Sequence, residues 1–125
     1  MNTVSDAVPA SFSDWRVYVL CAQWCGTCRA YEAVARTLAQ QGLARWVWVD
    51  IEAHADLLGD LDVENFPSLL IAQGTQLRFM GTVTPQPAVA QRLLQSLKAG
   101  GHGTVPDFPD ANRLLQVLAD LPALD

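Results

Sequence analysis

Three cysteines, Cys21, Cys25 and Cys28, lie within "LCAQWCGTCRAYE" (residues 20–32). The spacing of Cys25 and Cys28, with two residues between them, is compatible with a metal site, a structural disulfide or a centre for thiol–disulfide exchange. A tetrahedral zinc site usually has four protein ligands, and only three cysteines cluster here, so metal binding is the weakest of the three. We interpret Cys25 and Cys28 as a redox pair and expect neither a metal ion nor a cofactor.

Cys21 has several possible roles. It could complete a C-x3-C-x2-C cluster site, or it could act as a second resolving thiol. A cysteine at the end of a buried strand is most often a small hydrophobic residue. We therefore expect Cys21 to pack in the core and to point away from Cys25.

The elements around the cysteines indicate how the pair would work. Residues 16–22 are β-branched and aromatic without a turn signal, which predicts a buried strand. A helix is expected to begin near Cys25 and to end about Gln41, before Gly42. Cys25 would then lie at a helix N-terminus, where free N–H groups favour a thiolate, and would be the nucleophile. Cys28, one turn further in, would be shielded and would attack a mixed disulfide formed at Cys25.

The remaining patterns predict a strand at 44–51, a short helix near 53–60, two strands joined by a turn at Gly74, and a helix from Pro85 to Gly100. Because parallel strands need a right-handed crossover, this order predicts an α/β fold in which helices flank one central mixed sheet. The apolar spacing predicts the buried side of the two long helices to contain Ala30, Val34, Leu38, Val89, Leu93, Leu94 and Leu97.

Three segments resemble the thioredoxin superfamily between about Arg16 and Lys98. The segment "AQWCGTC" resembles the "AxWCGPC" of that family, "DVENFPSLLI" resembles the start of the strand that carries its cis-proline, and Gly81 matches the glycine after its last strand. A C-x-x-C beside a strand–helix–strand pattern is itself typical of thioredoxin-like redox proteins. The resemblance implies a thioredoxin-like fold.

The resemblance also implies how a substrate would be held. The cis-proline, here Pro67, would pack against the cysteines, and the backbone of Phe66 would hydrogen-bond an extended substrate. A cis bond before Pro67 is chemically reasonable because cis peptide bonds are almost confined to X-Pro. The residues that the resemblance places at the substrate are Trp24, Gly26, Thr27, Phe66, Pro67 and Gly81.

The chain departs from the family pattern at three positions. Reducing members carry a buried aspartate six residues before the first cysteine, where this chain has Val19, and the partner lysine would fall near Trp46. Thr27 replaces the usual proline between the cysteines and adds an N–H and a hydroxyl that could donate to a Cys25 thiolate. Both changes would stabilise reduced Cys25, so we expect a centre that is less reducing than a standard thioredoxin.

Composition limits the other possibilities. The chain has 125 residues, half of them hydrophobic, which suits one compact domain. A net charge of -5 offers no basic face for nucleic acid. The N-terminal residues lack the pattern of a signal peptide, and no stretch is long and apolar enough to cross a membrane. We expect a soluble, cytoplasmic monomer.

The resemblance ends near residue 98, so we divide the chain into a thioredoxin-like domain (1–98) and a C-terminal part (99–125). The latter reads as a linker followed by an extra C-terminal helix, capped by Asp110. Its apolar stripe is expected to pack on the same domain, although a partner-binding or dimerising helix is the alternative. The stripe consists of Ala111, Leu114, Leu115, Leu118 and Leu121.

Two classes of function fit these features. The first is a thiol–disulfide oxidoreductase that acts on disulfides of proteins or small molecules and is reduced by a thioredoxin reductase or another thiol donor. The second is a thioredoxin-like interaction or assembly-chaperone module without essential redox activity. The intact motif with Trp24 and Pro67 favours the first, whereas the absent ion pair and the extra helix favour the second.

Overall fold

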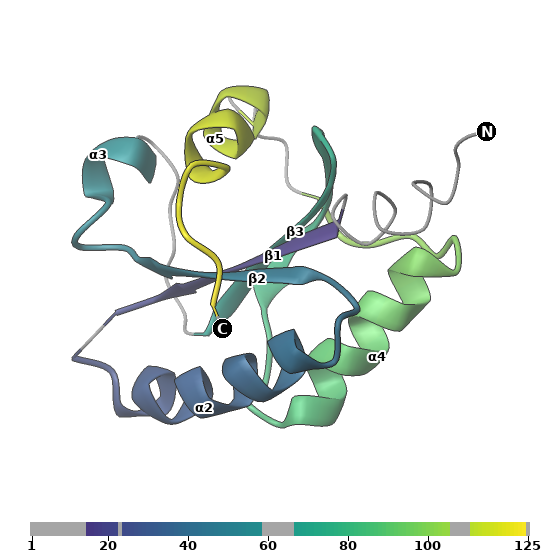
Figure 1. Cartoon of the computed structure of the whole chain (residues 1–125), viewed down its shortest axis with the longest axis horizontal. Helices are drawn as coiled ribbons and strands as arrows, with labels where there is room; N and C mark the ends of the chain where they lie inside the picture. Colours follow the sequence, from purple (N-terminus) through teal and green to yellow (C-terminus); the bar gives the residue numbers. More distant parts are fainter. Residues whose placement is uncertain (1–14, 23, 59–66, 106–110, 125) are drawn as a thin grey trace.

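The computed structural model describes residues 15–22, 24–58, 67–105 and 111–124, which form a mixed β-sheet between two layers of helices (Figure 1). The strand order is β2-β1-β3-β4. Strand β1 runs parallel to β2 and antiparallel to β3, and β3 and β4 are antiparallel. The strands are β1 (Trp15–Cys21), β2 (Arg45–Asp50), β3 (Ser68–Gln73) and β4 (Gln76–Thr82).

Helices cover both faces of this sheet, as the sequence predicted. Helices α2 (Gly26–Gln40) and α4 (Pro87–Lys98) lie on one face, and α3 (Ala55–Leu58) and α5 (Ala111–Leu118) lie on the other (Figure 1). The parallel pair β1 and β2 is connected through α2, which is the crossover that parallel strands require.

Strand β1 is buried on both faces because its side chains alternate between two apolar cores. Val17, Val19 and Cys21 pack in the core under α2 and α4. Tyr18 and Leu20 pack in the core under α3 and α5. The last residue of the central strand therefore points toward the helix that carries the other two cysteines.

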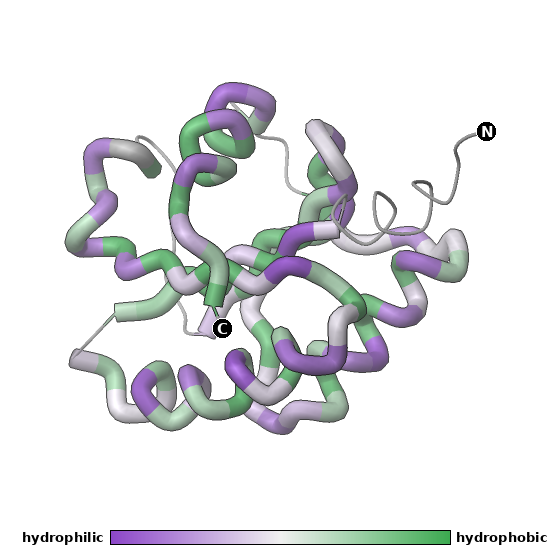
Figure 2. Tube along the Cα trace, in the orientation of Figure 1, coloured by the Kyte–Doolittle hydropathy of each residue, from purple (hydrophilic) through white to green (hydrophobic). Residues whose placement is uncertain are grey.

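The buried sides of α2 and α4 differ by about one residue from the prediction. Ala30 is exposed and Val89 is 37% exposed, so both predictions were wrong. The hydropathy of the two helices alternates along the chain, as expected for helices with one apolar side (Figure 2). The buried residues are Cys28, Tyr31, Ala35 and Leu38 in α2, and Ala90, Leu94 and Leu97 in α4.

Gly74 makes the tight connection between β3 and β4. Gln73 pairs with Gln76, which leaves two residues for the turn. Gly74 has φ of 60°, in the left-handed region that favours glycine. The predicted strand, turn and strand are therefore all present.

Helix α5 and the following segment pack on the sheet. Leu114, Leu115 and Leu118 are buried in the core under α3 and α5. Further on, the N–H of Leu124 donates to the carbonyl oxygen of Trp46 at 2.7 Å, along the outer strand β2. Asp110, the expected cap, lies outside the described residues. None of the described helices is long and apolar enough to cross a membrane.

Candidate functional site

Helix α2 begins directly after Cys25, which is its N-cap residue with extended backbone angles (φ −88°, ψ 117°). The N–H of Cys25 donates to the carbonyl oxygen of Ala22 at 3.1 Å, and its own carbonyl accepts from the N–H of Arg29 at 3.1 Å. No side chain among the described residues caps the helix. Cys25 thus precedes the N–H groups of the first turn, including that of Thr27, which have no acceptor within the helix.

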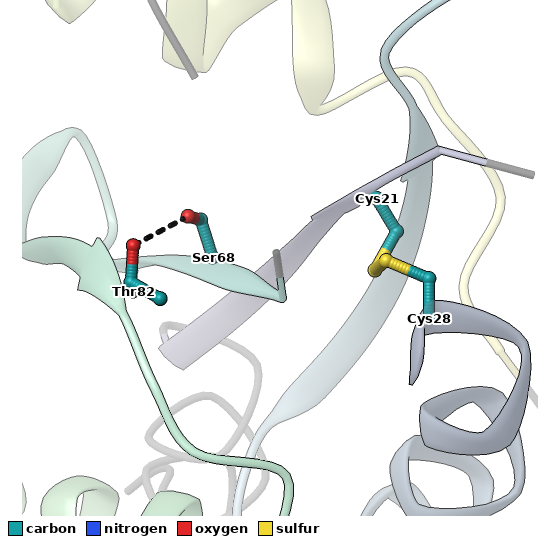
Figure 3. The surroundings of a disulfide bond; sticks show 4 residues. All are labelled: Cys21, Cys28, Ser68 and Thr82. Atoms are coloured by element: carbon teal, nitrogen blue, oxygen red, sulfur yellow. Dashed lines mark hydrogen bonds between the residues drawn. A yellow bond between two sulfur atoms is a disulfide. The ribbon is translucent and has the colours of Figure 1, made fainter. Parts of the chain in front are cut away.

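The three cysteines occupy different environments. Cys25 is free and partly exposed, whereas Cys21 and Cys28 have no exposed surface. Cys21 and Cys28 form a disulfide that joins the end of β1 to the first turn of α2, with their Cα atoms 5.7 Å apart (Figure 3). Helix α2 is therefore covalently tied to strand β1.

This pairing differs from the one expected from the sequence. We expected Cys28 to pair with Cys25 and Cys21 to be only a core residue, but Cys28 is bonded to Cys21. The physical reason is the direction of the side chains. Cys28 is buried against the face of the sheet on which Cys21 ends β1, whereas Cys25 is only partly buried at the edge of this core. Cys21 is buried as expected, and it has a partner that the sequence interpretation did not assign.

Those residues predicted to contact substrate that the structure describes lie at one end of the sheet. Trp24 is 64% exposed, and Gly26 and Thr27 are exposed on the first turn of α2. Pro67 is buried, and because Ser68 pairs with Leu20, it lies at the end of β3 nearest Cys21. The described residues thus include two of the segments where the prediction places a substrate, one at the start of α2 and one before β3.

Of the two remaining residues predicted to contact substrate, Gly81 is described by the structure and Phe66 is not. Gly81 pairs with Leu69 on the strand next to Pro67, and a Cβ at this position would lie 3.2 Å from Cζ of Phe79. Phe66 lies outside the described residues. The cis bond between Phe66 and Pro67, and the backbone contact to substrate, therefore stay predictions.

Ser68, which is buried, and Thr82, which is exposed, form a hydroxyl pair that was not predicted from the sequence. Their side-chain oxygens are 3.3 Å apart, and either hydroxyl could donate (Figure 3). Next to them, the N–H of Val83 donates to the carbonyl oxygen of Pro67 at 3.0 Å. Together these bonds hold the beginning of β3 to the end of β4. The signal for the pair, hydroxyl residues at the two outer ends of a predicted hairpin, was present in the sequence.

Among the described residues, the core behind the cysteines contains no ion pair at the position where reducing members of the family carry one. Val19 is fully buried, and its neighbours across the sheet are Trp48 and Leu69. Trp46, near the position expected for the lysine, is also buried. The apolar replacement of the buried aspartate and lysine is thus part of a continuous apolar core.

Two polar atoms in this core make no hydrogen bond with any described residue: the hydroxyl of Tyr31 and Nε1 of Trp46. Burial raises the pKa of Tyr31 to about 12 from 10.0, because the phenolate would lose its hydration. Tyr31 follows Cys28 by one helical turn. It is a neutral polar group near the disulfide and not a base at physiological pH.

A cavity of about 290 Å³ lies between the first turns of α2 and strand β2. Its lining residues are Ala22, Arg29, Glu32 and Trp48. Of these, Arg29 follows Cys25 by one helical turn. The part of the chain that the structure describes contains no group of three side chains placed to bind a metal ion.

Comparisons with known structures agree with this geometry. The structure resembles the germline-specific thioredoxin Deadhead of Drosophila melanogaster with a TM-score of 0.60 and 17% identity, covering 74% of this chain and 90% of that one. It resembles a mutant thioredoxin of Halobacterium salinarum with a TM-score of 0.61 and 22% identity, covering 83% and 89%. For mitochondrial thioredoxin 3 of Saccharomyces cerevisiae the values are 0.57, 20%, 74% and 87%. At these identities the likeness concerns the fold.

A comparison with family models gives the assignment. No curated protein matches the sequence significantly. The family model described as Thioredoxin matches residues 10–97, which is more than two thirds of the chain. The match includes the three cysteines, Pro67 and Gly81. The chain therefore belongs to the thioredoxin family.

Proposed function

We propose that this protein is a thiol–disulfide oxidoreductase that uses Cys25 and Cys28 to exchange disulfides with protein or small-molecule substrates. The observation that carries the proposal is the position of Cys25, a free and partly exposed thiol at the N-terminus of α2. Negative charge is stabilised there by the helix dipole and by unpaired N–H groups. Membership of the thioredoxin family and a bonded cysteine pair support disulfide exchange in general.

In the proposed reaction the Cys25 thiolate attacks a substrate disulfide and forms a mixed disulfide. Cys28 then attacks the sulfur of Cys25 and releases the reduced substrate. Trp24, exposed beside Cys25, would contact the substrate on one side. Phe66 and Pro67 would hold it on the other, with Gly26, Thr27 and Gly81 completing the surface.

We further propose that the centre is less reducing than a standard thioredoxin. Thr27 is the second residue of α2, and its N–H is one of the two that an acceptor at the N-cap position normally binds. Val19 replaces a buried carboxylate that would disfavour a nearby thiolate. Substrates would be disulfide-containing proteins, with a thioredoxin reductase or another thiol donor as electron source, and the protein would act as a cytoplasmic monomer.

Insulin reduction tests the proposal. The protein is assayed with dithiothreitol, and separately with a thioredoxin reductase and its reductant, as the wild type and as Cys25→Ser. We expect catalysed insulin precipitation with the wild type and the uncatalysed rate with Cys25→Ser. Cys28→Ser should accumulate a mixed disulfide through Cys25, because the resolving thiol is missing. Equal rates for the wild type and Cys25→Ser would contradict the proposal.

A second candidate function is an interaction or assembly module in which the cysteines serve only stability. The observation that favours it is the complete burial of Cys21 and Cys28, whose bond ties β1 to α2. Under this alternative, insulin reduction would be absent from the wild type. Cys25→Ser would then retain every interaction of the wild-type protein.

A further inference from the structure

We propose that Cys21 is a second resolving cysteine, which takes Cys28 into a buried disulfide and returns Cys25 to the free thiol. The proposal rests on the function proposed above and concerns the same centre. It adds a third sulfur to the reaction and makes Cys28 the sulfur shared by two disulfides.

Cys28 is a neighbour of Cys21 in space and of Cys25 along the chain. On one side it is bonded to Cys21, whose Cα is 5.7 Å away (Figure 3). On the other side Cys25 precedes it by three residues at the start of the same helix, a spacing at which side chains are neighbours. In the proposal, rotation of the Cys28 side chain moves its sulfur from one thiol to the other.

The reaction has three exchanges, starting from three thiols. The Cys25 thiolate attacks a substrate disulfide, so that bond breaks, a mixed disulfide forms and half of the substrate leaves as a thiolate. Cys28, as a thiolate, attacks the sulfur of Cys25 and releases the other half. Cys21, as a thiolate, then attacks the sulfur of Cys28, and Cys25 leaves as a thiolate. Overall the substrate disulfide gains two electrons, Cys21 and Cys28 lose one each, and their two protons go through solvent to the two product thiols.

The location of charge favours the third exchange. Cys25, the leaving sulfur, lies at the N-terminus of α2, where a thiolate is stabilised, and a stabilised thiolate leaves faster. Cys21 has no exposed surface and lies among apolar strand residues, where a thiolate is unfavourable. The buried site therefore holds the neutral disulfide, and the exposed site holds the charge.

A consequence is that the oxidised protein keeps its nucleophile. Neither sulfur of the Cys21–Cys28 disulfide is exposed, so an external thiol reaches it only after Cys25 has attacked Cys28 and drawn the disulfide to the surface. Cys25 is thus required both for the formation and for the reduction of the Cys21–Cys28 disulfide in the folded protein. Without Cys25, the oxidised protein should resist reduction while it is folded.

The pairing can be read after a single turnover. Reduced wild-type protein is mixed with excess insulin, N-ethylmaleimide is added to the folded protein, and iodoacetamide is added after unfolding. Cleavage after Trp24 separates Cys21 from Cys25 and Cys28. We expect N-ethylmaleimide on Cys25, no iodoacetamide label, and two fragments joined through Cys21.

The opposite pattern overturns the relay. If the fragments separate and Cys21 is labelled only after unfolding, the final disulfide joins Cys25 to Cys28 although insulin was reduced. If insulin is not reduced at all, the proposed function fails, and the relay fails with it. The two failures are therefore distinguishable in one experiment.

Two variants complete the test. Cys21→Ala should end the turnover with Cys25 and Cys28 bonded and no free thiol. Val19→Ala, on the same strand and in the same core, is the matched control and should keep the wild-type pairing. Any other pairing in Cys21→Ala, such as an unbonded Cys28, would contradict the exchange.

A separate measurement tests whether reduction of the buried disulfide requires Cys25. Cys25→Ser is oxidised with diamide in urea and then refolded, and its reduction by dithiothreitol is followed and compared with that of oxidised wild type. We expect reduction at least about tenfold slower in the folded variant, and equal rates for both proteins in urea. Equal rates in the folded proteins would overturn the proposal.

Discussion

Cys28 on the first turn of α2 is bonded to Cys21 at the end of β1, so a single disulfide connects the helix that carries Cys25 to the central strand of the sheet. The carbonyl of Cys21 is also held, because it accepts a hydrogen bond from the N–H of Ile51 at 2.9 Å. The N-terminus of α2 is thus positioned by a covalent bond on its inner side. On its outer side, Trp24 is exposed and Cys25 is partly exposed.

We expect reduction of the Cys21–Cys28 disulfide to lower the free energy of unfolding by about 2 kcal/mol. The bond closes a short loop. Because the entropy that a disulfide removes from the unfolded chain grows with loop length, a short loop gives a stabilisation at the low end of the range observed for disulfides. Urea unfolding of Cys25→Ser, oxidised and reduced, measures the difference without a free thiol that could exchange. Identical unfolding curves would contradict a bond between Cys21 and Cys28.

Much of the fold was predictable from local patterns. The apolar run of β1 and the turn at Gly74 each depend on neighbouring residues, so periodicity and turn chemistry were sufficient. The buried side of α2 was not, since alanine is compatible with either side of a helix and the prediction placed Ala30 inward. Tyr31 is the buried residue, because the inward side of α2 is aligned with Cys28, which contacts the sheet.

The candidate site was predictable in its parts and not in its pairing. Spacing alone placed Cys25 at the helix end and Cys28 one turn further in. The partner of Cys28 depends on how close the end of β1 comes to α2, which is a property of the packed structure. Three cysteines allow three pairings, and the sequence contains no local signal that distinguishes Cys21 from a core residue.

The replacement Thr27→Pro should lower the reduction potential of the Cys25–Cys28 couple. Proline removes an N–H from the first turn of α2, so the Cys25 thiolate loses a donor, and proline is tolerated at this part of a helix. One charge-assisted hydrogen bond corresponds to a shift on the order of 30 mV. The measurement is equilibration with glutathione in a Cys21→Ala background, where this couple is the only one among the three cysteines.

The same replacement in the presence of Cys21 gives a contrasting result. If the stable disulfide joins Cys21 to Cys28, Cys25 is a free thiol in both redox states, and Thr27→Pro should shift the potential far less. Thr27→Ser, which keeps the N–H and the hydroxyl, is the matched control in both backgrounds. A shift of equal size with and without Cys21 would indicate that Cys25 and Cys28 form the final disulfide.

Restoring the family's carboxylate alone, by Val19→Asp, should destabilise the protein by several kcal/mol. Val19 is fully buried and faces Trp48 and Leu69 across the sheet, so the carboxyl would have no cation among these neighbours. Burial would raise its pKa in the folded state above the unfolded value of about 3.9. The unfolded chain then releases its proton first as the pH rises, so stability should fall between that value and the raised one.

Val19→Asn is the control for this prediction because it has nearly the same shape without a charge. Urea unfolding between pH 4 and pH 7 should show a falling stability for Val19→Asp relative to Val19→Asn. A difference that does not change with pH would mean that the carboxyl is hydrated or paired, which would contradict the apolar environment described for Val19.

Tyr31→Phe should change the alkaline stability of the protein with little effect at neutral pH. The hydroxyl makes no hydrogen bond with the described residues, so its removal leaves no partner unpaired among them. The pKa of Tyr31 is raised by burial to about 12 from 10.0. Below pH 10 the phenol is neutral in both states and contributes no pH dependence. Above it the unfolded chain ionises first, and the folded protein loses stability as the pH rises toward 12.

The loss of folding stability caused by Tyr31 amounts to about 1.4 kcal/mol at pH 11, one unit above the unfolded pKa. We would measure urea unfolding of Cys25→Ser and of Cys25→Ser with Tyr31→Phe at pH 8 and at pH 11, since the absence of Cys25 prevents disulfide exchange in alkali. The phenylalanine variant should be the more stable of the two at pH 11, while the two differ little at pH 8. Equal losses in both proteins would indicate that the Tyr31 hydroxyl is solvated in the folded state, and hence that water reaches the core beside Cys28.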